Sequence, residues 1–367
     1  MDYNTDKGKG GGYMEHDGDR GKQKKYVLAG IGFLAAAVLL LAAARKVPGF
    51  AVWYTEHIYP YCVMTVGRLC GIVPFSVAEA GLYILVIWIV SYTAVYWRSP
   101  MRIVSRVILL LGILLFSYAV NCGINYYSRP FADSLSYGQE EYSWKELEEL
   151  CLYLTEKVNE YADYAGVRLE SAEYGSMGPE AMQELGREYE RLSGFYPRPK
   201  YLGIPWILSV QQLAGVYAPF TVEANYNNAM TAYNIPHTIC HELSHLKGFM
   251  REDEANFIGF LACVGSGEPV FRYSGYTIGW IYAGNALASA NMEAYQEIYE
   301  KLDGRVKADL QENNEFWERY EGRAAEAAEA VNDAYLKANS QEEGVESYGL
   351  VVDLMLGWFF QDIKEKE

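Results

Sequence analysis

Three long apolar segments precede a region in which apolar and polar positions alternate with helical spacing. The first, residues 26–44, carries no charge and is long enough for a membrane-spanning helix. Residues 80–97 and 103–120 are the second and third, and Arg106 in the third lies close enough to its start to reach the membrane surface. Because two apolar segments follow, 26–44 is predicted to be a retained span and not a cleaved signal peptide.

The part of the chain after residue 121 is predicted to be mainly helical. Residues 143–166 place leucine and valine side chains at helical intervals, and Ser143 is suited to cap that helix. The same spacing predicts further helices over 179–193, 238–248, 252–264, 279–302, 306–338 and 346–362. Residues 215–227 are β-branched and aromatic enough for one or two strands. The expected fold class is mainly α (α+β), three transmembrane helices followed by a helical domain with a small β-sheet.

Composition divides the chain into three parts. Residues 1–25 are polar and rich in Gly, Asp and Lys, which predicts a disordered cytoplasmic tail before a membrane region over 26–121. Residues 1–121 contain 12 Lys+Arg and 7 Asp+Glu, so 122–367 contain 31−12 = 19 basic and 47−7 = 40 acidic residues. The strongly acidic domain over 122–367 excludes nucleic acid as a partner, because phosphate binding needs a basic surface.

The basic residues also predict an orientation in the lipid bilayer. Arg20, Lys22, Lys24 and Lys25 lie next to the start of the first span and three basic residues lie at 98–106, whereas the opposite side has four: Arg45, Lys46, Arg68 and Arg129. Since basic residues concentrate in cytoplasmic loops, the N-terminus and the 98–106 turn are expected in the cytoplasm. The expected location is the cell membrane, multi-pass, with the domain over 122–367 extracytoplasmic. The sequence leaves the oligomeric state open.

The pattern His-Glu-x-x-His occupies residues 241–245, inside the helix predicted over 238–248. Four residues apart on a helix, His241 and His245 project from one face, so that two imidazole nitrogens can bind one Zn²⁺ ion. Glu242 is placed beside the open side of that ion. There it can act as the general base for an attacking water and return the proton to the leaving amine. The pattern therefore predicts a zinc hydrolase site.

Several residues are candidates for the third zinc ligand. A histidine in the pattern HExxHxxGxxH is excluded, because Arg251 stands at that position and a guanidinium cannot ligate zinc. Glu252 and Glu254 follow a sharp turn permitted by Gly248, but they lie roughly 200° apart around a helix, so only one can face the metal. His237 would put three histidines on one helical face, a disfavoured arrangement. Helical phase alone leaves Glu252 and Glu254 as alternatives.

The stretch "HELSHLKGF" followed by "EDEANFIGFL" resembles the zinc-binding segments of integral-membrane zinc metalloproteases, the group of the prenyl-protein endopeptidases and the mitochondrial stress protease. In their Glu-x-x-Ala-Asp pattern the glutamate is the third ligand and the aspartate orients a ligand histidine. The resemblance implies that Glu252 is the ligand and that Asn256 replaces the aspartate. The gap from His245 to Glu252 is shorter than in those proteases, and Asn256 lacks the aspartate's charge.

The wider pattern resembles more closely a bacterial family, domain-of-unknown-function family 3810. Its members have N-terminal spans and a core of the form HELxHxxGFxREDEANF, and the resemblance extends over most of the chain from the first span onward. Membership implies a zincin-like fold of the gluzincin type for residues 122–367. Glu252 is accordingly favoured as the third ligand over Glu254.

Two further parts of a peptidase site are expected. The strand region 215–227 could bind an extended substrate by strand addition, with Glu223 and Asn225 bordering the cleft. A hydrogen-bond donor should stabilise the oxyanion of the transition state. Tyr273 and Tyr276 are the favoured catalytic donors because glycines beside them allow close approach, and Tyr282 is a weaker candidate.

These observations predict a membrane-anchored zinc metalloendopeptidase that hydrolyses peptide bonds of extracytoplasmic or membrane-proximal proteins. The alternative is a zincin-like membrane sensor or regulator without general proteolytic activity. A transporter is disfavoured, because the three spans contain almost no ionisable residues of the kind that ion pathways require.

Overall fold

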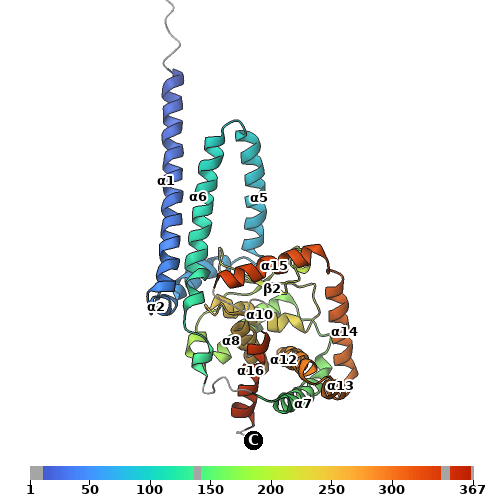
Figure 1. Cartoon of the computed structure of the whole chain (residues 1–367). Helices are drawn as coiled ribbons and strands as arrows, with labels where there is room; N and C mark the ends of the chain where they lie inside the picture. Colours follow the sequence, from blue (N-terminus) through green and yellow to red (C-terminus); the bar gives the residue numbers. More distant parts are fainter. Residues whose placement is uncertain (1–10, 136–141, 340–347, 365–367) are drawn as a thin grey trace, which may run out of the picture.

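Three long helices stand at one end of the molecule, here a computed structural model that describes residues 11–135, 142–339 and 348–364. They are α1 (Gly11–Lys46), α5 (Val77–Tyr96) and α6 (Pro100–Tyr118) (Figure 1). Each is long and apolar enough to cross a membrane, as the three apolar segments predict. Helix α1 begins at Gly11 and so includes residues 11–25 of the segment predicted as a tail, while residues 1–10 lie outside the described part of the chain.

Helices α1 and α6 pack with their backbones in contact. A Cβ atom at Gly30 would lie 2.7 Å from the carbonyl oxygen of Ile108, and one at Gly112 would lie 2.5 Å from the carbonyl oxygen of Gly30. Small residues at such a crossing allow the close van der Waals packing that holds helices together in lipid. Ser105 Oγ also donates a hydrogen bond of 2.6 Å to Gln23 Oε1 across the same pair of helices.

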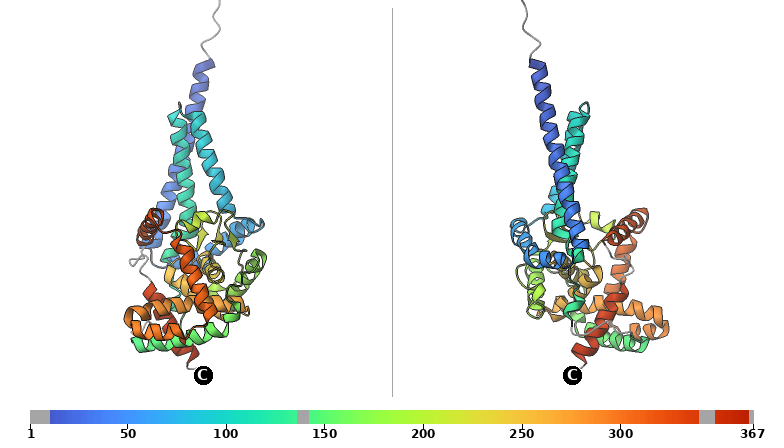
Figure 2. Two further views of the ribbon diagram at one scale, coloured as in Figure 1. Left: turned by 90° about the vertical axis from the view of Figure 1, so that its right-hand side faces the viewer. Right: turned by 60° about the vertical axis from the view of Figure 1, so that its left-hand side comes forward.

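Short helices connect α1 to α5 at the end of the three-helix bundle that adjoins the helical domain. They are α2 (Phe50–His57), α3 (Tyr59–Cys62) and α4 (Arg68–Cys70), with a π-helical turn over Val63–Gly67. The start of α1 and the turn between α5 and α6 both lie at the end away from the helical domain, where α1 extends beyond the turn (Figures 1 and 2). The two segments that the charge pattern assigns to one side of a membrane therefore share one end of the bundle.

The helical domain contains one three-stranded sheet. Its strands are β1 (Lys200–Tyr201), β2 (Gly215–Ala218) and β3 (Glu223–Tyr226), in the order β1-β3-β2. Strand β1 runs parallel to β3, whereas β2 and β3 form an antiparallel hairpin with Ala218 opposite Glu223. The strands predicted over 215–227 are confirmed as this hairpin, and β2 forms one edge of the sheet.

Helix α10 (Asn234–Leu246) runs through the centre of the domain, in contact with β2 and β3. Three helices pack around it: α8 (Ser171–Leu185), α11 (Glu252–Gly265) and α12 (Pro269–Ala290). Helix α7 (Trp144–Glu160) packs against α12, and Ser143 caps it in a reciprocal capping box with Glu146, as predicted. The domain is mainly helical with a small sheet, in agreement with the expected fold class.

The C-terminal helices differ from the prediction in where they are interrupted. The single helix predicted over 279–302 is divided between two helices, because Asn291 ends α12 and caps α13 (Met292–Glu300). The long helix predicted over 306–338 is α14 (Gly304–Glu318) and α15 (Arg323–Ala338). Gly322 separates them with φ +137°, a backbone conformation that other residues rarely adopt. Helix α16 (Tyr348–Gly357) continues into a π-helical turn over Trp358–Ile363, and α9 (Trp206–Ser209) follows β1.

Candidate metal centre and its cleft

Helix α10 has an apolar side that packs in the core and a polar side that lines a cleft. The packed side chains are fully buried: Ile239, Cys240, Leu243 and Leu246. The polar side contributes His237, Thr238, His241, Glu242 and His245 to the cleft wall. The apolar flanks of the His-Glu-x-x-His pattern therefore fix the helix in the domain, and its polar residues are presented on a rigid element.

The turn after α10 brings the next helix back toward the histidines. Gly248 has φ +94°. Its backbone N–H bonds the carbonyl of His245 at 2.9 Å, and the N–H of Phe249 bonds the carbonyl of Ser244 at 3.1 Å. This pair of hydrogen bonds is a Schellman motif, in which glycine is the usual residue at the left-handed position. The chain then reverses within a few residues, and α11 begins at Glu252.

Three side chains meet where α10 and the start of α11 converge. Glu252 Oε2 lies 3.3 Å from His241 Nε2, and Glu252 Oε1 lies 3.6 Å from His245 Nε2. One ligand atom from each of the three residues lies within 4.8 Å of the others, close enough for one ion to bind all three. Two imidazoles and one carboxylate are a common donor set for zinc. The structure thus brings together His241, His245 and Glu252.

Each histidine has a polar neighbour besides Glu252. His245 Nδ1 donates a hydrogen bond of 2.8 Å to the carbonyl of Phe249, which directs Nε2 toward Glu252. Burial lowers the pKa of His245 to about 4, so its ring is neutral at pH 7, the form that ligates metals. Burial alone would lower the pKa of His241, but Glu252 and, to a smaller extent, Asn256 raise it. The side chain of Asn256, where the resemblance expects an aspartate, thus lies close to His241 and favours its protonated form.

Glu242 is the least satisfied carboxylate of the cleft. Its side chain is buried, and Oε2 has no hydrogen-bond partner in the part of the chain that the structure describes. Burial raises the pKa of Glu242 to about 8. Gly215 of β2 lies directly against it, because a Cβ atom there would be 2.5 Å from Glu242 Oε1. A buried polar atom without a partner costs free energy, and in a cleft it is suited to meet a ligand.

The cleft in front of these residues has a volume of about 1360 Å³. Strand β2 forms one wall with Gly215, Val216 and Tyr217, while α10 and Glu252 of α11 form the floor. Helix α15 crosses the opposite side and contributes four alanines and four larger side chains: Ala324, Ala325, Ala327, Ala328, Glu329, Val331, Asn332 and Tyr335. The cleft is large enough to take a peptide segment between the edge strand and α15.

Two candidate ligands point elsewhere. Glu254 is buried, and its Oε1 accepts a hydrogen bond of 2.7 Å from the backbone N–H of Phe131, while burial raises its pKa to about 7. It does not belong to the cluster of ligand atoms, so the structure does not bring Glu254 together with the two histidines. His237 lines the cleft, but its Nε2 donates to the carbonyl of Asn256 at 3.1 Å, and it too lies outside the cluster.

The tyrosines predicted to be catalytic do not line the cleft. The Tyr273 hydroxyl donates a hydrogen bond of 2.8 Å to Asp309 Oδ2, and the Tyr276 ring stacks on Tyr161 with centroids 5.9 Å apart. Both side chains pack in the hydrophobic core, so the structure does not bring them together with the two histidines and Glu252. The tyrosines that line the cleft are Tyr126, Tyr217, Tyr282 and Tyr335. Of these only Tyr282 is a candidate from sequence; Tyr217 lies in the predicted strand region, and Tyr126 and Tyr335 come from distant segments without a local motif.

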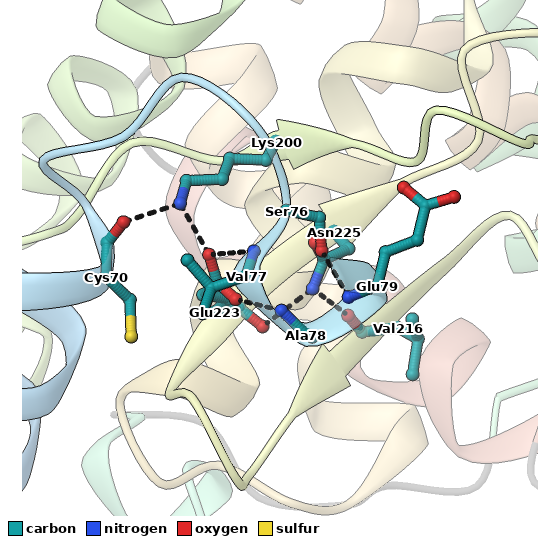
Figure 3. A network of polar contacts seen from close by, with 9 residues as sticks. All are labelled: Cys70, Ser76, Val77, Ala78, Glu79, Lys200, Val216, Glu223 and Asn225. Carbon is teal, nitrogen blue, oxygen red and sulfur yellow. Dashed lines mark hydrogen bonds and ion pairs between the residues drawn. The ribbon is translucent and has the colours of Figure 1, made fainter. Parts of the chain in front are cut away.

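Glu223 and Asn225 do not border the cleft either. Glu223 is buried in an ion pair, with Oε1 2.5 Å from Lys200 Nζ (Figure 3). Its carboxylate also accepts hydrogen bonds from the backbone N–H groups of Val77 at 3.2 Å and Ala78 at 2.8 Å, at the start of α5. The Asn225 amide donates to backbone carbonyls of the hairpin. Together these contacts form a joint between the sheet and the second apolar helix.

Fold and site together define a class of protein: a mainly helical chain with three apolar helices, whose second part places two histidines and one glutamate where they could hold a metal ion. The family described as "Protein of unknown function (DUF3810)" matches residues 54–356, so the chain belongs to that family. The match begins within α2, after the first apolar helix, and is shorter at the N-terminus than the sequence pattern suggests. No curated protein and no solved structure matches the chain.

Proposed function

We propose that the chain is a membrane-anchored zinc metallopeptidase that hydrolyses peptide bonds of extracytoplasmic or membrane-proximal proteins. The observation that carries this proposal is the approach of His241, His245 and Glu252 to within 4.8 Å of one another beside the buried Glu242 carboxyl group. Three protein ligands leave the fourth position of a tetrahedral zinc ion open, as catalytic sites require. The donor atoms and the unpartnered Glu242 Oε2 both fit that ion.

Each residue of the cluster has a separate task in this proposal. His241, His245 and Glu252 would hold the ion, which when bound supplies Lewis acidity to a peptide carbonyl and to water. Glu242 accepts the proton of the attacking water through Oε2, the atom that has no partner within the described residues. It then delivers that proton to the leaving amine nitrogen, so that one carboxyl group acts first as base and then as acid.

Strand β2 provides a place for an extended substrate beside Glu242. It lies at the edge of the sheet, and Gly215, Val216 and Tyr217 line the cleft. A peptide that added to this edge would bond its backbone to β2, so that binding would depend little on side-chain identity. The missing Cβ of Gly215 leaves room for the Glu242 carboxylate next to such a peptide.

The membrane placement rests on the three apolar helices and on the basic residues around them. Seven arginine and lysine side chains lie in the first half of α1 and around the α5–α6 turn, against four on the other side. Positive residues favour the cytoplasmic side, which puts the helical domain and its cleft on the extracytoplasmic side of the cell membrane. The bilayer and a polypeptide substrate are then the two partners of the chain.

The test compares the full-length protein with its Glu242→Gln variant in lipid nanodiscs. We expect both proteins to bind one zinc ion per chain. The variant should cleave a peptide library at no more than about one hundredth of the wild-type rate, because it lacks the base. Glu254→Gln is a matched control, since it neutralises a buried carboxylate outside the cleft and should leave cleavage intact. Equal cleavage by the wild type and Glu242→Gln would refute the role of Glu242.

A second candidate, a sensor or regulator, is favoured by the contacts of α15. Helix α15 covers the cleft, and its C-terminal end is bonded to the apolar helices and their extensions. Arg45 Nη2 donates to the carbonyl of Ala338 at 3.2 Å, and the Tyr118 hydroxyl donates to Asn339 Oδ1 at 2.8 Å. A change in the bundle could then be transmitted to the cleft. Stoichiometric zinc in the wild type without cleavage of any library peptide would support this function over the peptidase.

A further inference from the structure

Exposed apolar side chains gather where α5 and α6 meet the helical domain. Six of them form the patch that we name the collar: Leu69, Ile72, Phe75, Ile204, Trp206 and Phe220. Each is about half exposed or more, with exposed fractions from 48% for Ile204 to 74% for Ile72. They come from three separate segments, so the collar is not visible in any one stretch of sequence. Apolar surface of this extent is costly in water and indicates a partner.

The first segment, residues 69–75, runs directly into α5, and hydrogen bonds hold the other two segments at the ends of the apolar helices. Phe75 directly precedes Ser76, the N-cap of α5. The backbone N–H groups of Gly203 and Ile204 donate to the Glu79 carboxylate in the first turn of α5, at 2.6 and 2.9 Å. Trp206, at the start of α9, follows directly. The collar therefore has a fixed position relative to α5.

The β2–β3 hairpin is held at the same place by α6. Asn121 Nδ2, in the π-helical turn that extends α6, donates a hydrogen bond of 2.8 Å to the carbonyl of Pro219. Phe220 is the next residue, at the tip of the hairpin, and half of it is exposed. The tip of the hairpin whose strand β2 lines the cleft thus lies beside the end of an apolar helix.

We propose that the collar is a docking surface for the lipid bilayer, and that it holds the helical domain against the membrane with the cleft beside the lipid surface. A span that leaves the hydrocarbon core near Val77 leaves the preceding residues in the interfacial layer, which is about 5–8 Å thick on each side. Trp and Phe are favoured in that layer, and amphipathic surfaces bind there by burying apolar side chains. The collar is continuous with α5 and α6, which fits lipid better than a second protein.

This placement deepens the proposed function by naming the substrate class. Because Phe220 and β2 belong to one hairpin, a collar embedded in the interface would keep the edge strand next to the membrane surface. A polypeptide that is itself anchored in the membrane would then reach β2 with little loss of entropy, since anchoring raises its effective concentration. The inference rests on the proposed membrane placement of the three apolar helices.

Tryptophan fluorescence in full-length protein reconstituted into liposomes tests the collar directly. The probes are lipids brominated near the glycerol end or near the methyl end of the acyl chains, which quench tryptophans at matching depths. The emission of Trp206 is obtained by difference between the wild type and Trp206→Phe. Trp144→Phe supplies the matched control, because Trp144 is also exposed, at 42%, but lies at the start of α7 (Figure 1). Trp88, in the middle of α5, reports on the span itself.

We expect lipids brominated near the glycerol end to quench most of the Trp206 emission. Lipids brominated near the methyl end should quench most of the Trp88 emission. Neither lipid should quench Trp144. Quenching of Trp88 without quenching of Trp206 would overturn the collar proposal while leaving the membrane span intact. If neither tryptophan were quenched, the membrane placement itself would fail. Protection of Trp206 from an aqueous quencher without any bromine effect would assign the collar to a second copy of the chain and likewise contradict a lipid partner.

Discussion

Two buried carboxylates, Glu223 and Glu242, lie in the helical domain and differ in how their oxygens are partnered. Glu223 has an ion pair with Lys200 and two backbone N–H donors from the start of α5. Glu242 is as deeply buried, yet Oε2 has no partner within the described residues. Burial of a charged group is tolerated when its hydrogen bonds are made, so Glu223 has the properties of a structural group.

The difference shows why burial alone does not identify a functional carboxylate. Glu223 uses its charge to join β1, β3 and α5, as Figure 3 shows, and no oxygen remains to act on a ligand. Glu242 faces the cleft and adjoins the ligand cluster. The unpartnered oxygen lowers the stability of the fold, and such local destabilisation is typical of groups that act in catalysis. The comparison predicts that neutralising each residue affects a different property.

The largest expected effect on stability is that of Glu223→Gln. The substitution removes the negative charge that faces the buried Lys200 ammonium group, which should lower the free energy of unfolding by about 3–5 kcal/mol. Glu242→Gln is the counterpart, and because it breaks no ion pair and replaces a carboxyl group whose Oε2 has no partner within the described residues, it should leave stability unchanged or raise it. Denaturation midpoints of both variants in the same detergent measure the difference. Equal destabilisation by the two substitutions would contradict the comparison.

Gly215→Ala tests the close approach of β2 to Glu242. The added Cβ would lie 2.5 Å from Glu242 Oε1, so the carboxylate must move away from its position in the cleft. We expect a drop in cleavage rate with zinc content unchanged, and a loss of stability of about 1–3 kcal/mol from overpacking. Gly267→Ala is the matched control, since a Cβ there meets nothing within 4 Å. A variant at 215 with full activity would show that the position of Glu242 is unimportant.

Tyr273→Phe should have the smallest effect. It removes the hydroxyl that donates to Asp309, which should cost about 1 kcal/mol of stability. Because Tyr273 does not line the cleft, the cleavage rate at saturating substrate should stay at the wild-type value. Kinetics of the purified variant, together with its thermal midpoint, separate the two quantities. A large fall in kcat with normal stability would restore Tyr273 as a catalytic residue.

The sequence predicts those features that depend on local spacing. The three apolar segments, the helix that carries His241 and His245, and the sharp turn at Gly248 all appear where expected. Each depends on residues within a few positions of one another, so periodicity and glycine placement are enough to indicate it. Even the cap at Ser143 follows from a four-residue pattern.

Features that depend on distant segments could not be predicted in this way. Glu254 is directed away from the histidines by the backbone of Phe131, which is 123 positions earlier in the chain. The tyrosines of the cleft include Tyr126 and Tyr335, which no local motif connects to α10. Helical phase predicts that Glu252 and Glu254 face different directions, but it does not predict which of them faces the two histidines. The three-dimensional packing of α11 distinguishes their surroundings, because it places Glu252 beside the two histidines and Glu254 beside the backbone of Phe131.

The most direct test of the account is zinc content in Glu252→Ala and Glu254→Ala, each measured on the purified full-length protein beside the wild type. The account predicts about one zinc ion per chain in the wild type, loss of zinc in Glu252→Ala and retention in Glu254→Ala, because three donor atoms are needed to hold the ion. Retention of zinc by Glu252→Ala, or its loss from a folded Glu254→Ala protein, would contradict the metal centre proposed for this chain.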